Sequence, residues 1–412
     1  MNTISETKKW NPFVIAWVLG LLFYALEYAV RSAPSIMLPD LITAFSTTPG
    51  RVSAVIGSYY LTYSVTSLAA GIAIDKAGAK YPLFIGAILL GLGCILFSVA
   101  YLYTGYAGRL LQGMGSALAF PACVYLAARA FSPKRLATAI GATQSLGMLG
   151  GSAGQFLSAP VLKGGLPVNY FWIIMGIASF IIAGLIIYFT PTQKGAIAIV
   201  TTPPKRSLLA PYKIVFSNPQ SYLSGLISGL LFAPTTIFAM TWGVAFFQTG
   251  RGLDYTTATL ACALVPLGWA VGCPLLGWLA DRLGRKPVLV AGALVMILSL
   301  AQLCYFPTLM PAYFSTFLMG VASGAAMIPY SVIKEANPDS VKGSATGAIN
   351  FLTFGVTSLL GPVFSYLYGK SLNIVTNNEA NFRGAILFFI VIITVAIIAC
   401  LFLKETGKGA KK

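Results

Sequence analysis

The sequence contains no histidine and little charge, and both absences exclude whole classes of function. Without histidine the chain has no histidine general base, metal ligand or proton relay. Only 9% of its 412 residues are charged, whereas soluble globular proteins carry about 25%. With 57% apolar residues and a mean hydropathy of +0.81, the chain has too few charged residues to cover the surface of a soluble monomer.

The cysteines indicate no special chemistry. All six lie in apolar runs and none forms a Cys-x-x-Cys pair, so we interpret them as small buried hydrophobic residues. The sequence also shows no nucleophile–base set and no metal-ligand set. We therefore expect neither enzymatic activity nor a cofactor or metal site.

What the sequence does contain is long apolar runs. A membrane-spanning helix needs about 20 mainly apolar residues. Twelve such runs occur, at residues 12–38, 53–74, 81–102, 104–130, 137–161, 169–190, 221–247, 256–280, 287–308, 311–335, 344–368 and 381–403. The first is too long for a signal peptide and is interpreted as a retained span. The polar, proline-containing stretch at 191–220 separates the sixth run from the seventh and has the composition of a linker.

The basic residues predict the orientation. Lys and Arg number 27 against 10 Asp and Glu, which gives a net charge of +17. With the N-terminus inside, 20 basic residues fall in inside segments and 5 in outside segments. The positive-inside rule therefore predicts that both termini are cytoplasmic. This charge is spread over many short loops, unlike a nucleic-acid-binding surface, so we expect no nucleic-acid partner.

One loop occurs twice. Residues 71–80 read Gly-Ile-Ala-Ile-Asp-Lys-Ala-Gly-Ala-Lys, and residues 277–286 read Gly-Trp-Leu-Ala-Asp-Arg-Leu-Gly-Arg-Lys, 206 residues later. The first glycine lets two helices approach closely, and the second allows a tight turn. The aspartate is favoured near a helix N-terminus. Two copies at equivalent places in two sets of six spans indicate an internal repeat.

Because of this repeated loop, the sequence resembles the major facilitator superfamily, and the resemblance extends across essentially the whole chain. The second copy matches the superfamily signature fully, whereas the first departs from it at Ala79, where a basic residue is usual. A further element, Arg109-x-x-Gln112-Gly113-x-Gly115, is similar to one that is often implicated in proton coupling. The resemblance implies an all-α membrane protein with twelve transmembrane helices, in which two pseudo-symmetric six-helix bundles enclose a central cavity that faces each side in turn.

The resemblance also implies domain bounds and a gate. The bundles are expected at 1–190 and 221–412, joined by a cytoplasmic linker at 191–220. The conformational gate is expected at the repeated loop, that is, at Gly71, Asp75, Lys76, Gly78, Gly277, Asp281, Arg282, Gly284 and Arg285.

Only one of the ten acidic residues, Glu27, falls deep within a predicted span. Such a group is costly in a membrane and is a functional candidate by default. Arg31 follows at i, i+4, on the same helix face. If an anionic substrate group bound Arg31, Glu27 would lose its partner and accept a proton more readily, so the two would load together. The alternative is a structural ion pair. Arg109 is a third candidate for proton coupling, or it simply holds its helix against neighbouring helices.

The remaining candidates concern the substrate. Segments around Glu27, Trp242, Lys334–Pro338 and Gly343–Asn350 are similar to bacterial nutrient importers, including the phagosomal-transporter type. We therefore expect a monomer in the bacterial inner membrane that imports a small polar or anionic metabolite, such as an amino acid, nucleoside or organic acid, with protons. The alternative is an exporter or antiporter of drugs, siderophores or organic anions. The candidate substrate-binding residues are Tyr28, Arg31, Gln144, Trp242, Tyr330 and Asn350.

Overall fold

The computed structural model describes residues 11–192, 210–369 and 379–407, and all regular structure within these ranges is helical. The elements are α1 (Pro12–Ser32), η1 (Ala33–Ile36), α2 (Leu38–Ala44), α3 (Pro49–Ala77), α4 (Lys80–Ser98), α5 (Leu102–Ser116), α6 (Ala119–Ala130), α7 (Pro133–Phe156), α8 (Ser158–Lys163), α9 (Val168–Phe189), α10 (Ala210–Phe216), α11 (Pro219–Ala233), η2 (Pro234–Trp242), α12 (Gly243–Arg251), α13 (Tyr255–Leu283), α14 (Arg285–Tyr305), α15 (Ala312–Ser323), η3 (Gly324–Met327), α16 (Ile328–Glu335), η4 (Asp339–Val341), α17 (Lys342–Tyr368) and α18 (Glu379–Phe402).

Each of the twelve predicted spans corresponds to one long helical stretch. Ten stretches of the described residues are long and apolar enough to cross a membrane. The other two predicted spans, α3 and α7, are 29 and 24 residues long but richer in polar and small residues. Both pack against the opposite half of the chain, α3 against α17 and α7 against α13. They are less apolar because much of their surface faces protein rather than lipid.

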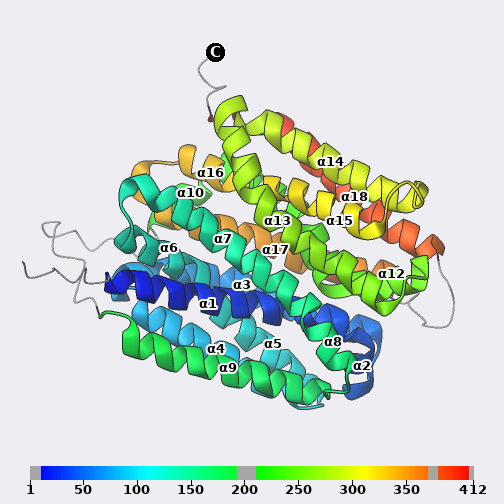
Figure 1. Ribbon diagram of the computed structural model, residues 1–412. Helices are drawn as coiled ribbons and strands as arrows, with labels where there is room; N and C mark the ends of the chain where they lie inside the picture. Colours follow the sequence, from blue (N-terminus) through cyan, green and yellow to red (C-terminus); the bar gives the residue numbers. More distant parts are fainter. Residues whose placement is uncertain (1–10, 193–209, 370–378, 408–412) are drawn as a thin grey trace, which may run out of the picture.

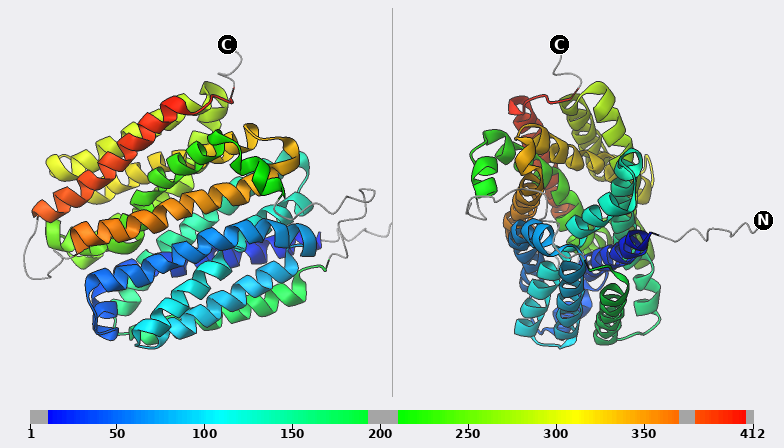
Figure 2. Two further views of the ribbon diagram at one scale, coloured as in Figure 1. Left: turned by 180° about the vertical axis from the view of Figure 1, so that it is seen from behind. Right: turned by 90° about the vertical axis from the view of Figure 1, so that its left-hand side faces the viewer.

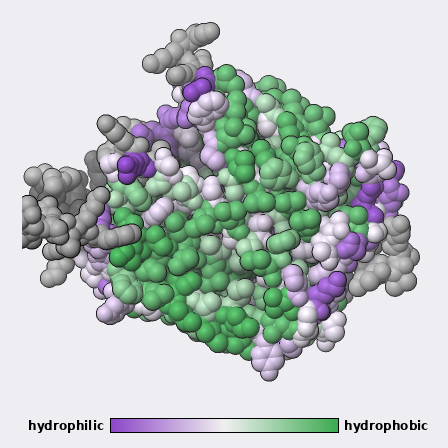
Figure 3. All heavy atoms as spheres, in the orientation of Figure 1, coloured by the Kyte–Doolittle hydropathy of each residue, from purple (hydrophilic) through white to green (hydrophobic). Residues whose placement is uncertain are grey.

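The helices run roughly parallel in two groups (Figure 1). Helices α1, α4, α5 and α9 lie in the lower group, and α14, α15 and α18 lie in the upper group. Figure 2 shows the same separation from behind and along the helices. A broad apolar band covers the middle of the visible face, and hydrophilic residues gather at its two ends (Figure 3). This distribution is that of a membrane-embedded helical protein.

The two ends of the described chain lie on the same side. The Asn11 side chain donates to the carbonyls of Arg129 and Ala130, the last two residues of α6. Glu405 accepts a hydrogen bond from the backbone N–H of Arg285 at the start of α14, and both ends lie at the side of the molecule where the chain termini are drawn in Figure 2. We call this side the terminal side and the other the opposite side. Most of the predicted linker lies outside the described residues, and its described part includes the short helix α10.

Among the described residues the first, fourth, fifth, seventh and tenth spans change their helical form along their length, the fifth at Leu157 between α7 and α8. The first and tenth contain the 3₁₀ segments η1 and η3, and the fourth is interrupted between α5 and α6. The seventh contains η2, nine residues of π-helix that begin at Pro234. π-helical turns are rare and are frequent at functional sites.

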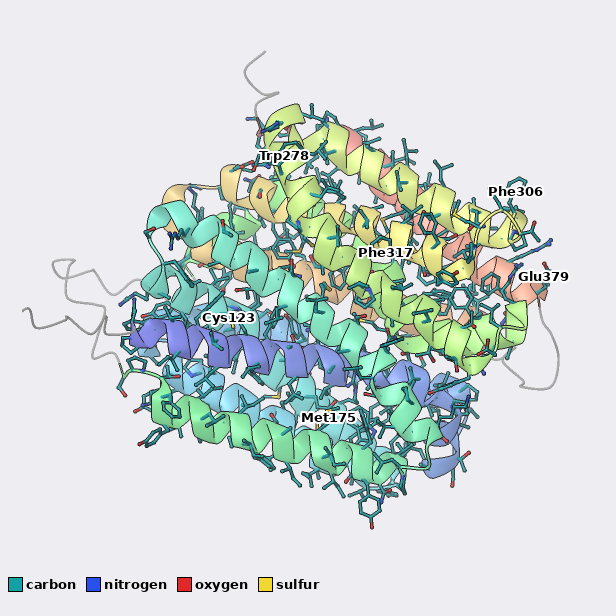
Figure 4. All side chains as sticks on the ribbon, in the orientation of Figure 1. Cys123, Met175, Trp278, Phe306, Phe317 and Glu379 are labelled. Atoms are coloured by element: carbon teal, nitrogen blue, oxygen red, sulfur yellow. The ribbon has the colours of Figure 1, made fainter. Side chains whose placement is uncertain are left out.

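Glycines allow the close contacts that position the centre of the first half. A Cβ at Gly113 of α5 would lie 2.2 Å from the Tyr59 carbonyl oxygen, and one at Gly150 of α7 would lie 2.2 Å from the Ala25 carbonyl oxygen. The sulfur of Cys123, labelled in Figure 4, similarly packs against α1 at Gly20. Helices α5, α6 and α7 are thereby held directly against α1 and α3.

Candidate functional site

Glu27, Arg31 and Tyr59 form a closed hydrogen-bonded triangle. Arg31 Nη2 lies 3.1 and 3.0 Å from the two carboxylate oxygens of Glu27, as the i, i+4 spacing predicts. Tyr59, on α3, donates to Glu27 Oε2 at 2.9 Å and accepts from Arg31 Nε at 3.1 Å. Neither charged side chain is exposed to solvent. The pair is therefore fully desolvated, and removing one partner would leave the other charge buried and uncompensated.

Aromatic rings surround the Arg31 guanidinium. Its carbon lies 4.1 Å from the ring centre of Tyr28, 4.7 Å from that of Tyr63 and 5.2 Å from that of Tyr59. Phe354 of α17, in the second half of the chain, lies at 5.4 Å. Arg31 Nη1 has no hydrogen-bond partner among the described residues. The two N–H groups of this nitrogen thus remain available to a further acceptor.

Arg109 lies beside this triangle without joining it. It donates to Gln112 Oε1 at 2.7 Å, to the Val30 carbonyl at 3.3 Å and to the Ile56 carbonyl at 3.4 Å. Its guanidinium carbon lies 4.6 Å from the ring centre of Tyr59. The residue therefore ties α5 to α1 and α3, and it reaches Glu27 only through Tyr59.

A small cavity lies between the two halves, with a free volume of about 10 Å³, which is room for about one water molecule. None of its lining residues is charged: they are Tyr24, Tyr28, Tyr63, Phe120, Gln144, Phe232, Met327, Tyr330, Asn350 and Phe354. We call it the central cavity. Four of the predicted substrate-binding residues, Tyr28, Gln144, Tyr330 and Asn350, line it. Arg31 lies behind the rings of its wall.

Trp242, also a predicted substrate-binding residue, lies elsewhere. It lines a second small cavity, towards the opposite side, between α3, η2 and α17. Its indole nitrogen has no hydrogen-bond partner in the described part of the chain, and neither has the Tyr60 hydroxyl in the same wall. Trp242 is the last residue of the π-helix, whose periodicity differs from the α-helical one that a sequence pattern assumes.

Hydrogen bonds join the two halves along their length. On the opposite side, Gln155 Nε2 donates at 2.6 Å both to Ser35 Oγ and to the carbonyl of Ala239 in η2. Tyr255 donates to the Ile36 carbonyl at 2.9 Å. Further cross-half bonds are Ser145 to the Ala270 carbonyl, Ser64 to the Phe351 carbonyl and Tyr212 to the Leu68 carbonyl. The halves are therefore closed around the central cavity.

The second copy of the repeated loop carries an ion-pair network on the terminal side. Arg285 Nη1 lies 2.6 Å from Asp281 Oδ1, and Nη2 lies 2.7 Å from Glu335 Oε1 at the end of α16. Arg282 instead lies over the ring of Trp278, which Figure 4 labels. Ala79 occupies the place of Arg285 in the first copy. The methyl group of Ala79 cannot form such a network, so the loops differ where the sequence departs from the signature.

The other expected gate residues lie at or near the ends of α3 and α13. In the first copy, Gly78 has a φ of 70° and ends α3. Gly284 ends α13 with a φ of 105°. Left-handed φ values of this kind favour glycine in both turns. Lys76 is exposed, and nothing is described of the Asp75 side chain. Gly71 and Gly277 both lie about two turns before these helix ends.

Glu405, after the last helix, was not predicted as a site residue but binds this network. Its Oε1 accepts from the backbone N–H of Arg285 at 2.7 Å, and its Oε2 accepts from that of Lys286 at 2.8 Å. Partial burial raises its pKa, but the backbone donors of Lys286 and Arg285 outweigh this effect, and the pKa of Glu405 is lowered. The C-terminal segment thus caps the N-terminus of α14.

Comparison with known proteins agrees with this fold. The model of the Major Facilitator Superfamily matches residues 20–362. Two solved structures superpose over 95% of the chain: a bacterial homologue of the human lysosomal transporter Spinster, with a TM-score of 0.73 and 14% identity, and the nucleoside transporter NupG, with a TM-score of 0.75 and 18% identity. The superposed regions include 97% of the Spinster homologue and 100% of the NupG chain. At such identities they show the fold alone.

Two curated relatives align over most of their length. The membrane sensor protein UhpC of Salmonella typhimurium is 24% identical over 379 residues, which is 82% of each chain. The hexuronate transporter of Bacillus subtilis is 22% identical over 402 residues, which is 90% of each chain.

Proposed function

Because the chain belongs to the Major Facilitator Superfamily, a family of membrane transporters, we propose that it imports a small polar or anionic metabolite together with protons. The observation that carries this proposal is the fully buried Glu27–Arg31 pair. Structural neighbours and relatives include transporters for a nucleoside and for a hexuronate, which are metabolites of this class. We further propose that the protein is a monomer, with bundles at 1–190 and 221–412 and its terminal side in the bacterial cytoplasm.

In the proposed mechanism the substrate and the proton load together. An anionic group or a hydrogen-bond-accepting oxygen of the substrate would compete with Glu27 for Arg31, whose Nη1 has no partner among the described residues. Glu27, without its cation, would then accept a proton, and Tyr59 would keep the carboxyl oriented. Neutralising the buried acid lowers the cost of rearranging the halves. Arg109 would fix Tyr59 and the three helices around it.

The experiment is uptake into proteoliposomes of radiolabelled glucuronate, a hexuronate, and of uridine, a nucleoside. An inward proton gradient should drive uptake of one of them. Glu27→Gln should abolish this uptake but retain counterflow exchange, which needs no net proton movement. The double variant Glu27→Gln/Arg31→Gln controls for the instability that an unpaired buried Arg31 would cause. Gradient-driven uptake by Glu27→Gln at the unmodified rate would refute proton coupling through Glu27.

A membrane sensor is the second candidate, because UhpC is named as one and aligns over 82% of its length. A sensor would bind its ligand in the same place but turn it over slowly or not at all. Saturable binding without uptake or counterflow in the same proteoliposomes would favour this function over transport.

An exporter or antiporter remains the alternative within transport. The efflux pump PmrA of Streptococcus pneumoniae is 28% identical over 182 residues, which is 43% of each chain. The direction of substrate flux under an imposed pH gradient separates this alternative from symport.

A further inference from the structure

Two amide side chains face the central cavity from equivalent positions in the two halves. Gln144 lies on α7 and Asn350 on α17, and they are 206 residues apart, the same offset as that of the repeated loops. The surrounding segments also match: residues 139–144 read Ala-Ile-Gly-Ala-Thr-Gln, and residues 345–350 read Ala-Thr-Gly-Ala-Ile-Asn. The internal repeat therefore places one amide in each wall of the cavity.

A tyrosine of the same half orients each amide. Tyr24 on α1 donates to Gln144 Oε1 at 3.1 Å, and Tyr330 on α16 donates to Asn350 Oδ1 at 2.6 Å. All four side chains are buried. Buried amides held in this way are preorganised hydrogen-bonding groups, and each presents both a donor and an acceptor.

Aromatic rings provide the rest of the wall. Phe120 lies 5.7 Å from Tyr24 in the first half, and Phe232 lies 5.3 Å from Phe354 in the second, measured between ring centres. Flat rings bind the faces of flat ligands, and amides bind the polar edges. No charged side chain is among the lining residues.

We infer that Gln144 and Asn350 form an amide clamp that grips one uncharged ring of the substrate, with adjacent hydrogen-bond donor and acceptor groups on its edge. The inference rests on the proposed function, since the halves must separate to admit a ring into a cavity of about 10 Å³. A nucleobase provides a flat face and a polar edge, whereas the puckered ring of a sugar acid provides C–H groups for the aromatic rings and hydroxyls for the amides. Arg31, behind the rings, would bind any separate anionic group.

The test measures equilibrium binding to the full-length purified protein, which needs no proton gradient and so can succeed even if proton coupling fails. The probes are uridine, glucuronate and succinate, the last an anion without such a ring. We expect uridine or glucuronate to bind and succinate to bind at least about 10-fold more weakly. Binding of uridine identifies a heterocycle edge, and binding of glucuronate identifies sugar hydroxyls. Binding of neither, or of succinate equally well, would overturn the inference.

Variants test the clamp itself. Gln144→Met and Asn350→Leu should each weaken binding about 10-fold, because each removes one hydrogen-bonding group. If both amides hold the same ring, the double variant should lose clearly less affinity than the product of the two single effects.

Gln302→Met is the control, since Gln302 is a buried amide on α14 that bonds to the Phe306 carbonyl, away from the cavity. Unchanged affinity in both single variants would contradict the clamp. If Gln144→Met fails to fold, Tyr24→Phe replaces it, with an expected loss of about 3-fold.

Discussion

The Arg31 guanidinium lies 5.4 Å from the ring centre of Phe354, and these two residues belong to opposite halves of the molecule. The contact places the only deeply buried ion pair of the described spans at the seam that would open in the proposed transport mechanism. Phe354 also packs on Tyr63, with ring centres 4.4 Å apart. The charge state of the Glu27–Arg31 pair is therefore positioned to affect how the halves fit together.

We first predict that Phe354→Leu destabilises the closed form. Leucine keeps most of the apolar volume but loses the cation–π contact, which is worth about 2 kcal/mol when desolvated. The expected result is a lower melting temperature of the purified protein.

Phe388→Leu is the control for this prediction, because the ring of Phe388 packs within the second half, on Phe364 and Tyr368. If the Arg31 contact matters, the effect of Phe354→Leu should shrink in an Arg31→Gln/Glu27→Gln background. An equal effect in both backgrounds would show that only packing was lost.

The second prediction compares two adjacent tyrosines. Tyr59→Phe removes the hydroxyl that joins Glu27 to Arg31, and hydrogen bonds to charged groups contribute about 1.5–3 kcal/mol. Gradient-driven uptake should fall at least about 10-fold, while counterflow is retained. Tyr60→Phe removes a buried hydroxyl that has no hydrogen-bond partner within the described ranges, so it should change neither rate. Both variants keep the aromatic ring, so similar losses in the two would indicate that uptake does not depend specifically on the hydroxyl of the triangle.

The third prediction concerns pH and the C-terminal cap. The folded-state pKa of Glu405 is lowered, so its stabilising effect is complete above the unfolded value of about 4.3 and is lost as pH falls through the lower folded value. Glu405→Gln should reduce the melting temperature at pH 7 by roughly 1–2 °C, as expected for loss of one partly buried helix cap in a chain of this size. The difference from the unmodified protein should vanish in stronger acid.

Glu379→Gln is the control for this cap. Glu379, labelled in Figure 4, begins α18 on the opposite side and pairs with Arg383 at the surface. Exposed pairs contribute little, so its melting temperature should stay the same at pH 7. A difference between Glu405→Gln and the unmodified protein that persisted at low pH would show that the carboxylate charge is not the cause.

The sequence predicted the spans and the Glu27–Arg31 pair because both depend on residues that are close together in the chain. Hydropathy over about 20 residues identifies a span, and i, i+4 spacing fixes which residues share a helix face. The roles proposed for these residues remain predictions. Phe354 and Glu405 could not be found in this way, because their contacts join segments far apart in the chain. Trp242 shows a second limit, since a π-helix changes the facing of side chains without any clear signal in composition.

The final prediction concerns Gln155, which joins the halves on the opposite side by donating to the Ala239 carbonyl and also donates to Ser35 of its own half. Gln155→Leu removes both hydrogen bonds and leaves the Ala239 carbonyl without this donor, so the closed seam should open more often. Labelling of a cysteine at Ser53, a buried residue in the wall of the Trp242 cavity, measures this opening in a background without the native cysteines. The closed form would lose its bond across the halves and hold an acceptor that lacks this donor, which should speed maleimide labelling of Ser53→Cys about 10-fold. Gln302→Leu removes a buried amide that bonds only within the second half, and it should leave the labelling rate as it was. If Gln155→Leu also left it unchanged, the seam would be held by packing of α7 on α13 and α3 on α17, and Gln155 would serve only to satisfy the Ala239 carbonyl of the π-helix.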